Sequence, residues 1–148
     1  MKKKYAIGIN GLLLIWFMLD MTGLELAGKT LVSQAWREDG IFMLIFIGLF
    51  LLFIFKESIG KYLLTIWLLM WFVMQFFSHW SFTIAGVGIG TDKIEYYKGT
   101  IKIIESYSRY IPDLYHVIEH ILILSALIVM IIFCIRHSKR MNALSTSQ

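Results

Sequence analysis

The segment Tyr110–Ile135 reads YIPDLYHVIEHILILSALIVMIIFCI, and its two halves differ in character. Ionisable and polar side chains are concentrated up to His120, and an almost uninterrupted apolar run follows. Pro112 suits the first position of a helix, because the N–H group that proline lacks has no helical partner there. Asp113 then lies in the first turn, where the helix dipole favours a carboxylate. As a helix, Leu114–Ile135 rises ~33 Å at ~1.5 Å per residue, which is enough to cross a bilayer.

The rest of the chain is similarly apolar. Of its 148 residues 58% are hydrophobic, and the mean hydropathy is +0.71, which excludes an ordinary soluble domain. The net charge of +4 falls mostly at predicted helix ends, so it indicates a membrane surface and no nucleic acid. The single cysteine, Cys134, permits no internal disulfide and excludes a thiol–disulfide oxidoreductase that works within one chain.

Four apolar runs separated by charged segments predict a single domain with four membrane-spanning helices. We expect an all-α integral membrane protein, an antiparallel bundle of four transmembrane helices. The expected spans are 5–26, 39–56, 62–82 and 112–135. The loops 27–38 and 83–111 then lie on one side of the membrane, and the short turn 57–61 lies on the other side.

The last loop contains an amphipathic segment, residues 92–109, with the sequence DKIEYYKGTIKIIESYSR. Its apolar side chains recur every three or four positions, which favours a helix that lies on the outer membrane surface. Gly99 and the β-branched residues around it are unfavourable in a helix, so a short β-hairpin is the alternative.

The distribution of Lys and Arg predicts the orientation. The N-terminus, the turn at 56–61 and the C-terminal segment together carry eight of them in short stretches, whereas the two other loops carry six over a greater length. Because short cytoplasmic segments are enriched in Lys and Arg, we expect a multi-pass protein of the cell membrane with both termini in the cytoplasm. The lipid bilayer is then the one expected partner. A protein partner or a homo-oligomer is left open.

Ionisable residues of three predicted spans lie at one level. Counting ~1.5 Å per residue places them all within roughly 10 Å of the outer membrane boundary. They are Asp20, His79, His116, Glu119 and His120. Such groups are costly inside a membrane and usually have partners and a function. The histidines at 116 and 120 share a helix face, as metal-binding pairs do. With His79 as a third nitrogen ligand, and Glu119 or Asp20 as a carboxylate, the set predicts a divalent metal site for zinc, or for iron or manganese.

Two other functions compete with the metal site. His79 and either His116 or His120 could ligate a b-type haem for electron transfer, although the few small residues near them favour a bare ion. Alternatively, the protein is a non-catalytic membrane subunit or interaction partner, and the polar groups only hold helices together. In that case Glu119 would pair with Arg109 or Lys102. The sequence does not decide between an enzyme and a binding protein.

The sequence argues against a peptidase function, and it places one histidine outside the predicted site. The string from His116 to His120 fits the H-x-x-E-H pattern of a zinc-peptidase family. We interpret this match as coincidence, because that family needs a further carboxylate downstream and no acidic residue follows Glu119. His137 follows the fourth span and is expected at the opposite membrane surface.

Overall fold

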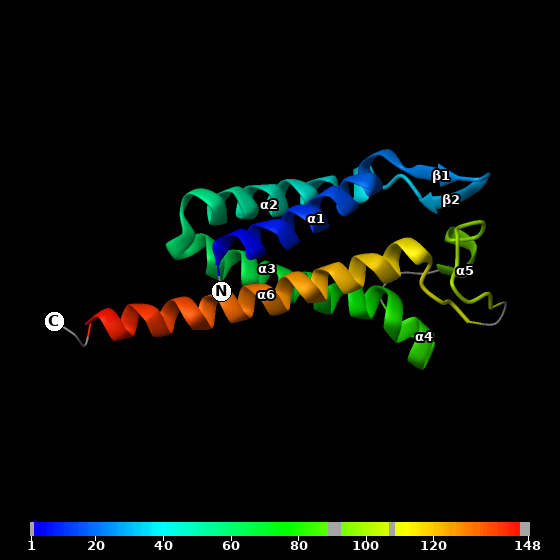
Figure 1. Ribbon diagram of the computed structural model, residues 1–148. Helices are drawn as coiled ribbons and strands as arrows, with labels where there is room; N and C mark the ends of the chain where they lie inside the picture. Colours follow the sequence, from blue (N-terminus) through cyan, green and yellow to red (C-terminus); the bar gives the residue numbers. More distant parts are fainter. Residues whose placement is uncertain (1, 89–92, 107–108, 146–148) are drawn as a thin grey trace.

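The computed structural model describes residues 2–88, 93–106 and 109–145, and these are mostly helical (Figure 1). The α-helices are α1 (Lys3–Thr22), α2 (Trp36–Phe55), α3 (Glu57–Gln75), α4 (Ser81–Ala85), α5 (Lys93–Tyr96) and α6 (Leu114–Ser145). A π-helical turn, η1 (Phe76–Trp80), joins α3 to α4. The strands β1 (Leu24–Leu26) and β2 (Lys29–Val32) form an antiparallel hairpin between α1 and α2.

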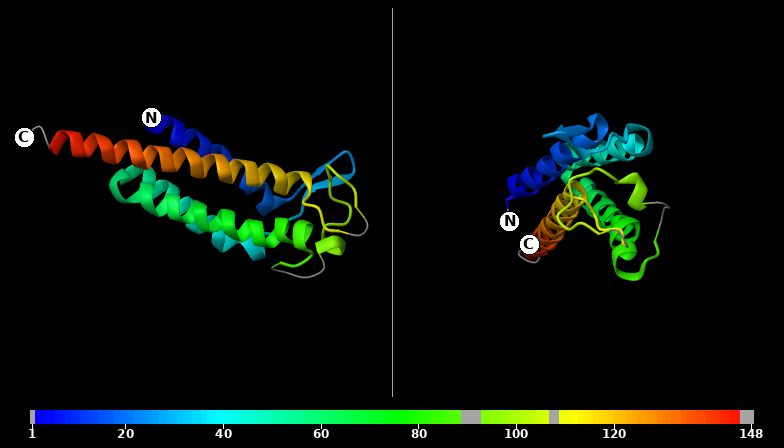
Figure 2. Two further views of the ribbon diagram at one scale, coloured as in Figure 1. Left: turned by 90° about the horizontal axis from the view of Figure 1, so that it is seen from below. Right: turned by 90° about the vertical axis from the view of Figure 1, so that its right-hand side faces the viewer.

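Four helical segments of the described residues are long and apolar enough to cross a membrane. They are Lys3–Thr22, Trp36–Phe55, Glu57–Ala85 and Leu114–Ser138. Both α2 and α6 pack against α1, and both also pack against α3 (Figures 1 and 2). Large apolar side chains remain on the outside, with Ile41 and Phe55 exposed by 74% and 79%. An apolar surface of this extent suits a lipid environment.

The interior between these helices is apolar and rich in aromatic rings. Leu64 of α3 and Ile123 of α6 are fully buried. Trp71 of α3 packs against Phe17 of α1 at a ring-centroid distance of 4.7 Å, and against Phe42 of α2 at 5.1 Å. These three rings form the boundary between the apolar core and a polar region at one end of the molecule. That end carries β1, β2 and α5, and we call it the loop end (Figure 1).

The opposite end carries both chain termini and the connection between α2 and α3. Lys56 alone separates these helices, so the connection is shorter than the predicted turn 57–61. Gly60 permits this close approach, because a Cβ atom there would lie 2.4 Å from backbone atoms of Phe53. No larger residue could occupy this position without moving the backbone.

A polar network joins the helices at this terminal end. Glu57 accepts from Lys3 Nζ at 3.2 Å and from His137 Nε2 at 3.2 Å. Lys61 Nζ, in a side chain only 3% exposed, donates to His137 Nδ1 at 2.7 Å. His137 therefore lies at the end opposite the other three histidines, as the sequence predicted.

The loop end is closed by backbone hydrogen bonds between segments that are distant in sequence. Ala27 and Gly28 have φ angles of 51° and 76°, typical of a two-residue hairpin turn. Thr30 of β2 accepts from the Ile101 N–H at 2.9 Å, and the Ile101 carbonyl accepts from the Leu114 N–H at 2.8 Å. The hairpin, the last loop and the start of α6 are thus held together.

Most helix boundaries differ by a few residues from those of the predicted spans, and three of them bear on the site. The first helix ends at Thr22, because Gly23 (φ 70°) caps it and donates to the Leu19 carbonyl; the residues after it form β1. The second begins at Trp36, three residues before the predicted start of its span at Asp39. The fourth begins at Leu114, so Asp113 lies before the first turn.

The amphipathic helix expected over 92–109 is not formed in the described part of that segment. Only Lys93–Tyr96 is helical, and Gly99 follows with a φ of 86°, which a helix cannot accommodate. Residues 97–106 contribute turns and isolated bridges, including Lys102 with Asp113. Residues 92, 107 and 108 lie outside the described residues.

Candidate functional site

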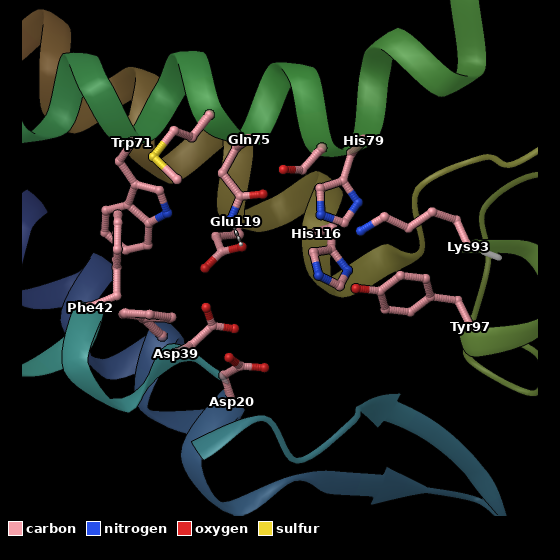
Figure 3. A pocket seen from close by; sticks show the side chains of 13 residues that line it. Asp20, Asp39, Phe42, Trp71, Gln75, His79, Lys93, Tyr97, His116 and Glu119 are labelled. Atoms are coloured by element: carbon pink, nitrogen blue, oxygen red, sulfur yellow. Dashed lines mark hydrogen bonds between the residues drawn. The ribbon is translucent and has the colours of Figure 1, made fainter. Parts of the chain in front are cut away.

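A cavity of about 190 Å³ lies at the loop end, bordered by α1, α2, α3, η1, α5 and α6 (Figure 3). Its polar lining includes three carboxyl groups, two imidazoles and one ammonium group: Asp20, Asp39, Glu119, His79, His116 and Lys93. Its apolar lining includes the three aromatic residues that cap the core, Phe17, Phe42 and Trp71. The cavity therefore combines charge with aromatic surface.

Two of the carboxyl groups face each other from neighbouring helices. Asp20 lies in the last turn of α1 and Asp39 in the first turn of α2, and their side chains are within hydrogen-bonding reach (Figure 3). The Ala35 N–H donates to the Asp20 backbone carbonyl at 2.8 Å, which fixes α2 beside the end of α1. Asp20 is only 7% exposed, and no N–H group of the described residues donates to its carboxylate. The two carboxyl groups thus share a small space, and the Asp20 carboxylate has no N–H partner there in the described part of the chain.

The third carboxyl group, Glu119, lies deeper and is 1% exposed. Gln75 Nε2 donates to its Oε2 at 3.1 Å, and the Tyr115 hydroxyl donates to its Oε1 at 3.5 Å. Both partners are neutral. Among the described residues no Lys or Arg forms an ion pair with Glu119, so the alternative pairing with Arg109 or Lys102 is not observed.

His116 is held by the residue that caps its helix. Asp113 Oδ1 accepts from the backbone N–H of His116 at 3.0 Å and contacts its Nδ1 at 2.6 Å. The first contact is a helix N-cap, which the sequence reading missed because it placed Asp113 inside the first turn. The second fixes the imidazole ring and leaves Nε2 as the nitrogen free to act in the cavity.

His79 is presented by the π-helical turn η1, and π turns inside α-helices occur often at functional sites. Its Nδ1 is hydrogen-bonded to the Tyr110 hydroxyl at 2.5 Å. Its ring stacks on that of His116, with centroids 4.2 Å apart and an interplanar angle of 30°. Two oriented imidazoles therefore form one wall of the cavity (Figure 3).

His120 lies behind this wall. Its ring centroid is 5.7 Å from that of His79, but its Nδ1 donates to the backbone carbonyl of His116. It borders a separate apolar groove, together with residues such as Phe76 and Trp80, and does not line the cavity. Of the five predicted site residues, the structure therefore gathers Asp20, His79, His116 and Glu119 around one cavity and places His120 beside it.

The imidazoles converge, but they are not arranged as a shared ligand set. A metal ion lies near the plane of each imidazole that binds it, and two rings stacked at 4.2 Å do not meet at such a point. Within the described ranges, no group of three or more His, Cys, Asp or Glu residues is arranged to hold a metal ion. Metal binding by Asp20, His79, His116, Glu119 and His120 stays a prediction.

The haem alternative has little space. Stacked rings leave no room for a porphyrin between His79 and His116. The cavity of about 190 Å³ is also below the roughly 300 Å³ at which pockets for drug-sized ligands begin. Haem binding likewise stays a prediction, and the dimensions of the cavity favour a smaller ligand.

The sequence reading missed two charged residues of the cavity, Asp39 and Lys93. The apolar run predicts Asp39 only as the boundary of its span, although an acidic residue so close to an apolar run is itself typical of the first turn of a helix. Lys93 reaches the cavity from α5 (Figure 3). Burial lowers the pKa of Lys93, and the Asp39 carboxylate opposes this shift. Beside it, burial raises the pKa of Tyr97, so the Tyr97 hydroxyl stays neutral at physiological pH.

A second cavity of about 300 Å³ adjoins the first and shares Asp20, Asp39 and Lys93 with it. Its remaining lining includes Glu38, which is exposed, and Tyr96. A path therefore runs from the surface of the loop end toward the carboxyl pair.

No protein-family model matches the chain, and no curated protein and no solved structure matches it either.

Proposed function

We propose that the protein is a multi-pass membrane protein whose polar cavity binds a small cation. In this proposal the four long helices form an antiparallel bundle in the cell membrane, and both termini lie in the cytoplasm. The apolar outer surface of the helices and the density of Lys and Arg at the terminal end support this placement. The cavity then opens to the extracytoplasmic side.

The balance of charge in the cavity carries the proposal. Three carboxyl groups line it, and the only ammonium group among the described lining residues is Lys93. Asp113 does not line the cavity, and its Oδ1 contacts Nδ1 of His116. An ionised carboxyl group in apolar surroundings is costly unless an opposite charge lies close to it. A bound cation would supply that charge to Asp20, Asp39 and Glu119 together.

A divalent metal is one candidate for this cation. The side chains of Asp20 and Glu119 would provide oxygen ligands, as expected from the sequence, and Asp39 would add another. Either His79 or His116 would first have to rotate out of the stacked pair before both could bind the same ion. Oxygen ligands alone suit Mg²⁺ or Mn²⁺ better than Zn²⁺.

The test is ligand-dependent stability of the purified, full-length protein in detergent. A ligand that binds the folded state raises the unfolding temperature as its concentration rises above its dissociation constant. We expect at least one of Mg²⁺, Mn²⁺, Zn²⁺ and tetramethylammonium to stabilise the wild type. The substitutions Asp20→Asn and Glu119→Gln should each weaken that effect.

The matched control is Glu25→Gln, because Glu25 is an exposed carboxylate of β1 that does not line the cavity. This variant should respond to the cation as the wild type does. The proposal fails if no cation stabilises the wild type. It also fails if Glu25→Gln weakens the response as much as Asp20→Asn does.

A further inference from the structure

We infer that the cation bound in this cavity is an organic ammonium group, as carried by a small alkylamine or a quaternary amine. This inference rests on the proposed cation site and names its ligand class. It comes from the aromatic residues that line the cavity, Phe17, Phe42 and Trp71, which do not enter the charge balance.

Aromatic and acidic side chains alternate around the cavity on the same helix faces. On α1, Phe17 precedes Asp20 by three residues, and on α2, Asp39 precedes Phe42 by three. Residues three apart in a helix are neighbours on one face, so each helix offers a carboxylate and a ring to the same space. Trp71 of α3 joins both rings, at centroid distances of 4.7 and 5.1 Å.

This combination matches the chemistry of an organic ammonium. Its positive charge is spread over C–H and N–H groups, which are attracted to aromatic rings as well as to carboxylates. A bare metal ion gains little from Phe17 or Phe42, and needs several lone pairs that point at one position. Among the described residues no such group of three ligands is arranged for it.

The size of the cavity agrees with this ligand. A volume of about 190 Å³ corresponds to roughly six water molecules at ~30 Å³ each. That is room for a group of several non-hydrogen atoms and more than a dehydrated metal ion requires. The adjoining cavity, with Glu38 and Tyr96 in its wall, offers the same combination of a carboxylate and an aromatic ring along the way in.

A substitution at Lys93 tests the inference, because it is expected to strengthen binding of a cation. The Asp39 carboxylate opposes the lowering of the Lys93 pKa by burial, and the Lys93 ammonium group lies 5.7 Å from the centroid of the Tyr97 ring. The side chain thus brings a positive charge to the wall of the cavity, where it would repel a ligand ammonium. Removing its charge with Lys93→Gln should strengthen binding of an external cation, whereas general damage to the fold would weaken it.

The experiment is calorimetric titration of the full-length protein in detergent with tetramethylammonium, with tert-butanol as an uncharged probe of similar shape. We expect saturable binding of tetramethylammonium only. Asp20→Asn should weaken it by about tenfold or more. Phe42→Leu, which keeps an apolar side chain but removes the ring, should weaken it by about fivefold. Lys93→Gln should tighten it, and Glu25→Gln should leave it unchanged.

Titrations with Mg²⁺, Mn²⁺ and Zn²⁺ separate the two proposals. If only the metal ions bind, and Asp20→Asn abolishes their binding, the ammonium inference is wrong and the cation site stands. If neither class of cation binds, both are wrong. Equal binding of tert-butanol, or tetramethylammonium binding that ignores both Asp20→Asn and Phe42→Leu, would also overturn the inference.

Discussion

Replacing Asp113 by alanine removes two interactions from one buried oxygen atom. Asp113 is 1% exposed, and its Oδ1 contacts both the backbone N–H and the Nδ1 of His116. Loss of an N-cap costs about 1 kcal/mol. Loss of a hydrogen bond to a charged group costs about 2 kcal/mol more. We therefore expect Asp113→Ala to lower the free energy of unfolding by about 3 kcal/mol.

Asp113→Asn separates the two contributions. Asparagine caps helices as well as aspartate does, so the contact with the backbone N–H of His116 should persist. Only the charge on the partner of the imidazole is lost, and we expect a cost of about 1 kcal/mol, since charged hydrogen bonds are roughly twice as strong as neutral ones. The assay is reversible unfolding of both variants in mixed micelles, followed by far-ultraviolet circular dichroism.

Two results would refute this account of Asp113. Equal destabilisation by Asn and Ala would show that the cap contributes nothing. A cost below about 0.5 kcal/mol for Asp113→Ala, which is the range of surface substitutions away from any special feature, would show that neither contact matters. The exposed residue Glu25 provides the baseline, because Glu25→Gln changes a carboxylate without breaking a hydrogen bond of the described residues.

Three further predictions concern the buried acid, the tight helix connection and the topology. Without a bound cation, Glu119→Gln should leave the unfolding temperature unchanged or raise it, because it removes a costly buried charge; a wild type that contains metal and loses both metal and stability on substitution would favour the metal site instead. Gly60→Ala should destabilise the protein by about 3 kcal/mol or prevent folding, because a Cβ atom would overlap backbone 2.4 Å away, whereas Gly48→Ala on the open face of α2 should be neutral or stabilising in the same unfolding assay. In a variant without Cys134, single cysteines at 33 and 58 should be labelled by an impermeant reagent from opposite sides of the membrane; labelling from one side would contradict the proposed topology.

The long helices could be predicted because their cause is local. An apolar run bounded by charges is visible in the sequence, and the run before Arg136 in α6 is the clearest example. The ends of the helices depend on other parts of the chain. The start of α2 at Trp36 accompanies the hydrogen bond from the Ala35 N–H to the Asp20 carbonyl, a contact between two helices. Glycine in a positive-φ conformation, as at Gly23, also leaves no periodic signal.

For the candidate site, the depth of the side chains could be predicted from the sequence, but their orientation could not. Counting residues along a helix gives the depth of a side chain, so the common level of Asp20, His79 and His116 could be seen in advance. Which way each group turns could not, because the orientation of His79 depends on Tyr110 and on a π-helical turn. Lys93 reaches the cavity only because the last loop folds back over it, and helical periodicity in that loop pointed to a different structure.

The π-helical turn makes the chemistry of the cavity sensitive to chain length as well as to residue identity. A π turn holds one more residue than an α-helical turn, so everything after it is rotated by ~100° relative to an uninterrupted helix. Gln75 lies just before η1 and His79 lies within it, and both line the cavity. The offset acts on the residues after η1, such as Thr83 of α4, whose hydroxyl donates to the Tyr110 carbonyl at 3.0 Å. Removal of a single residue from η1 would restore a continuous helix and turn Thr83 away from Tyr110, the residue whose hydroxyl orients His79. A variant with one residue fewer there would keep the carboxyl groups of the cavity and lose this support of its imidazole wall.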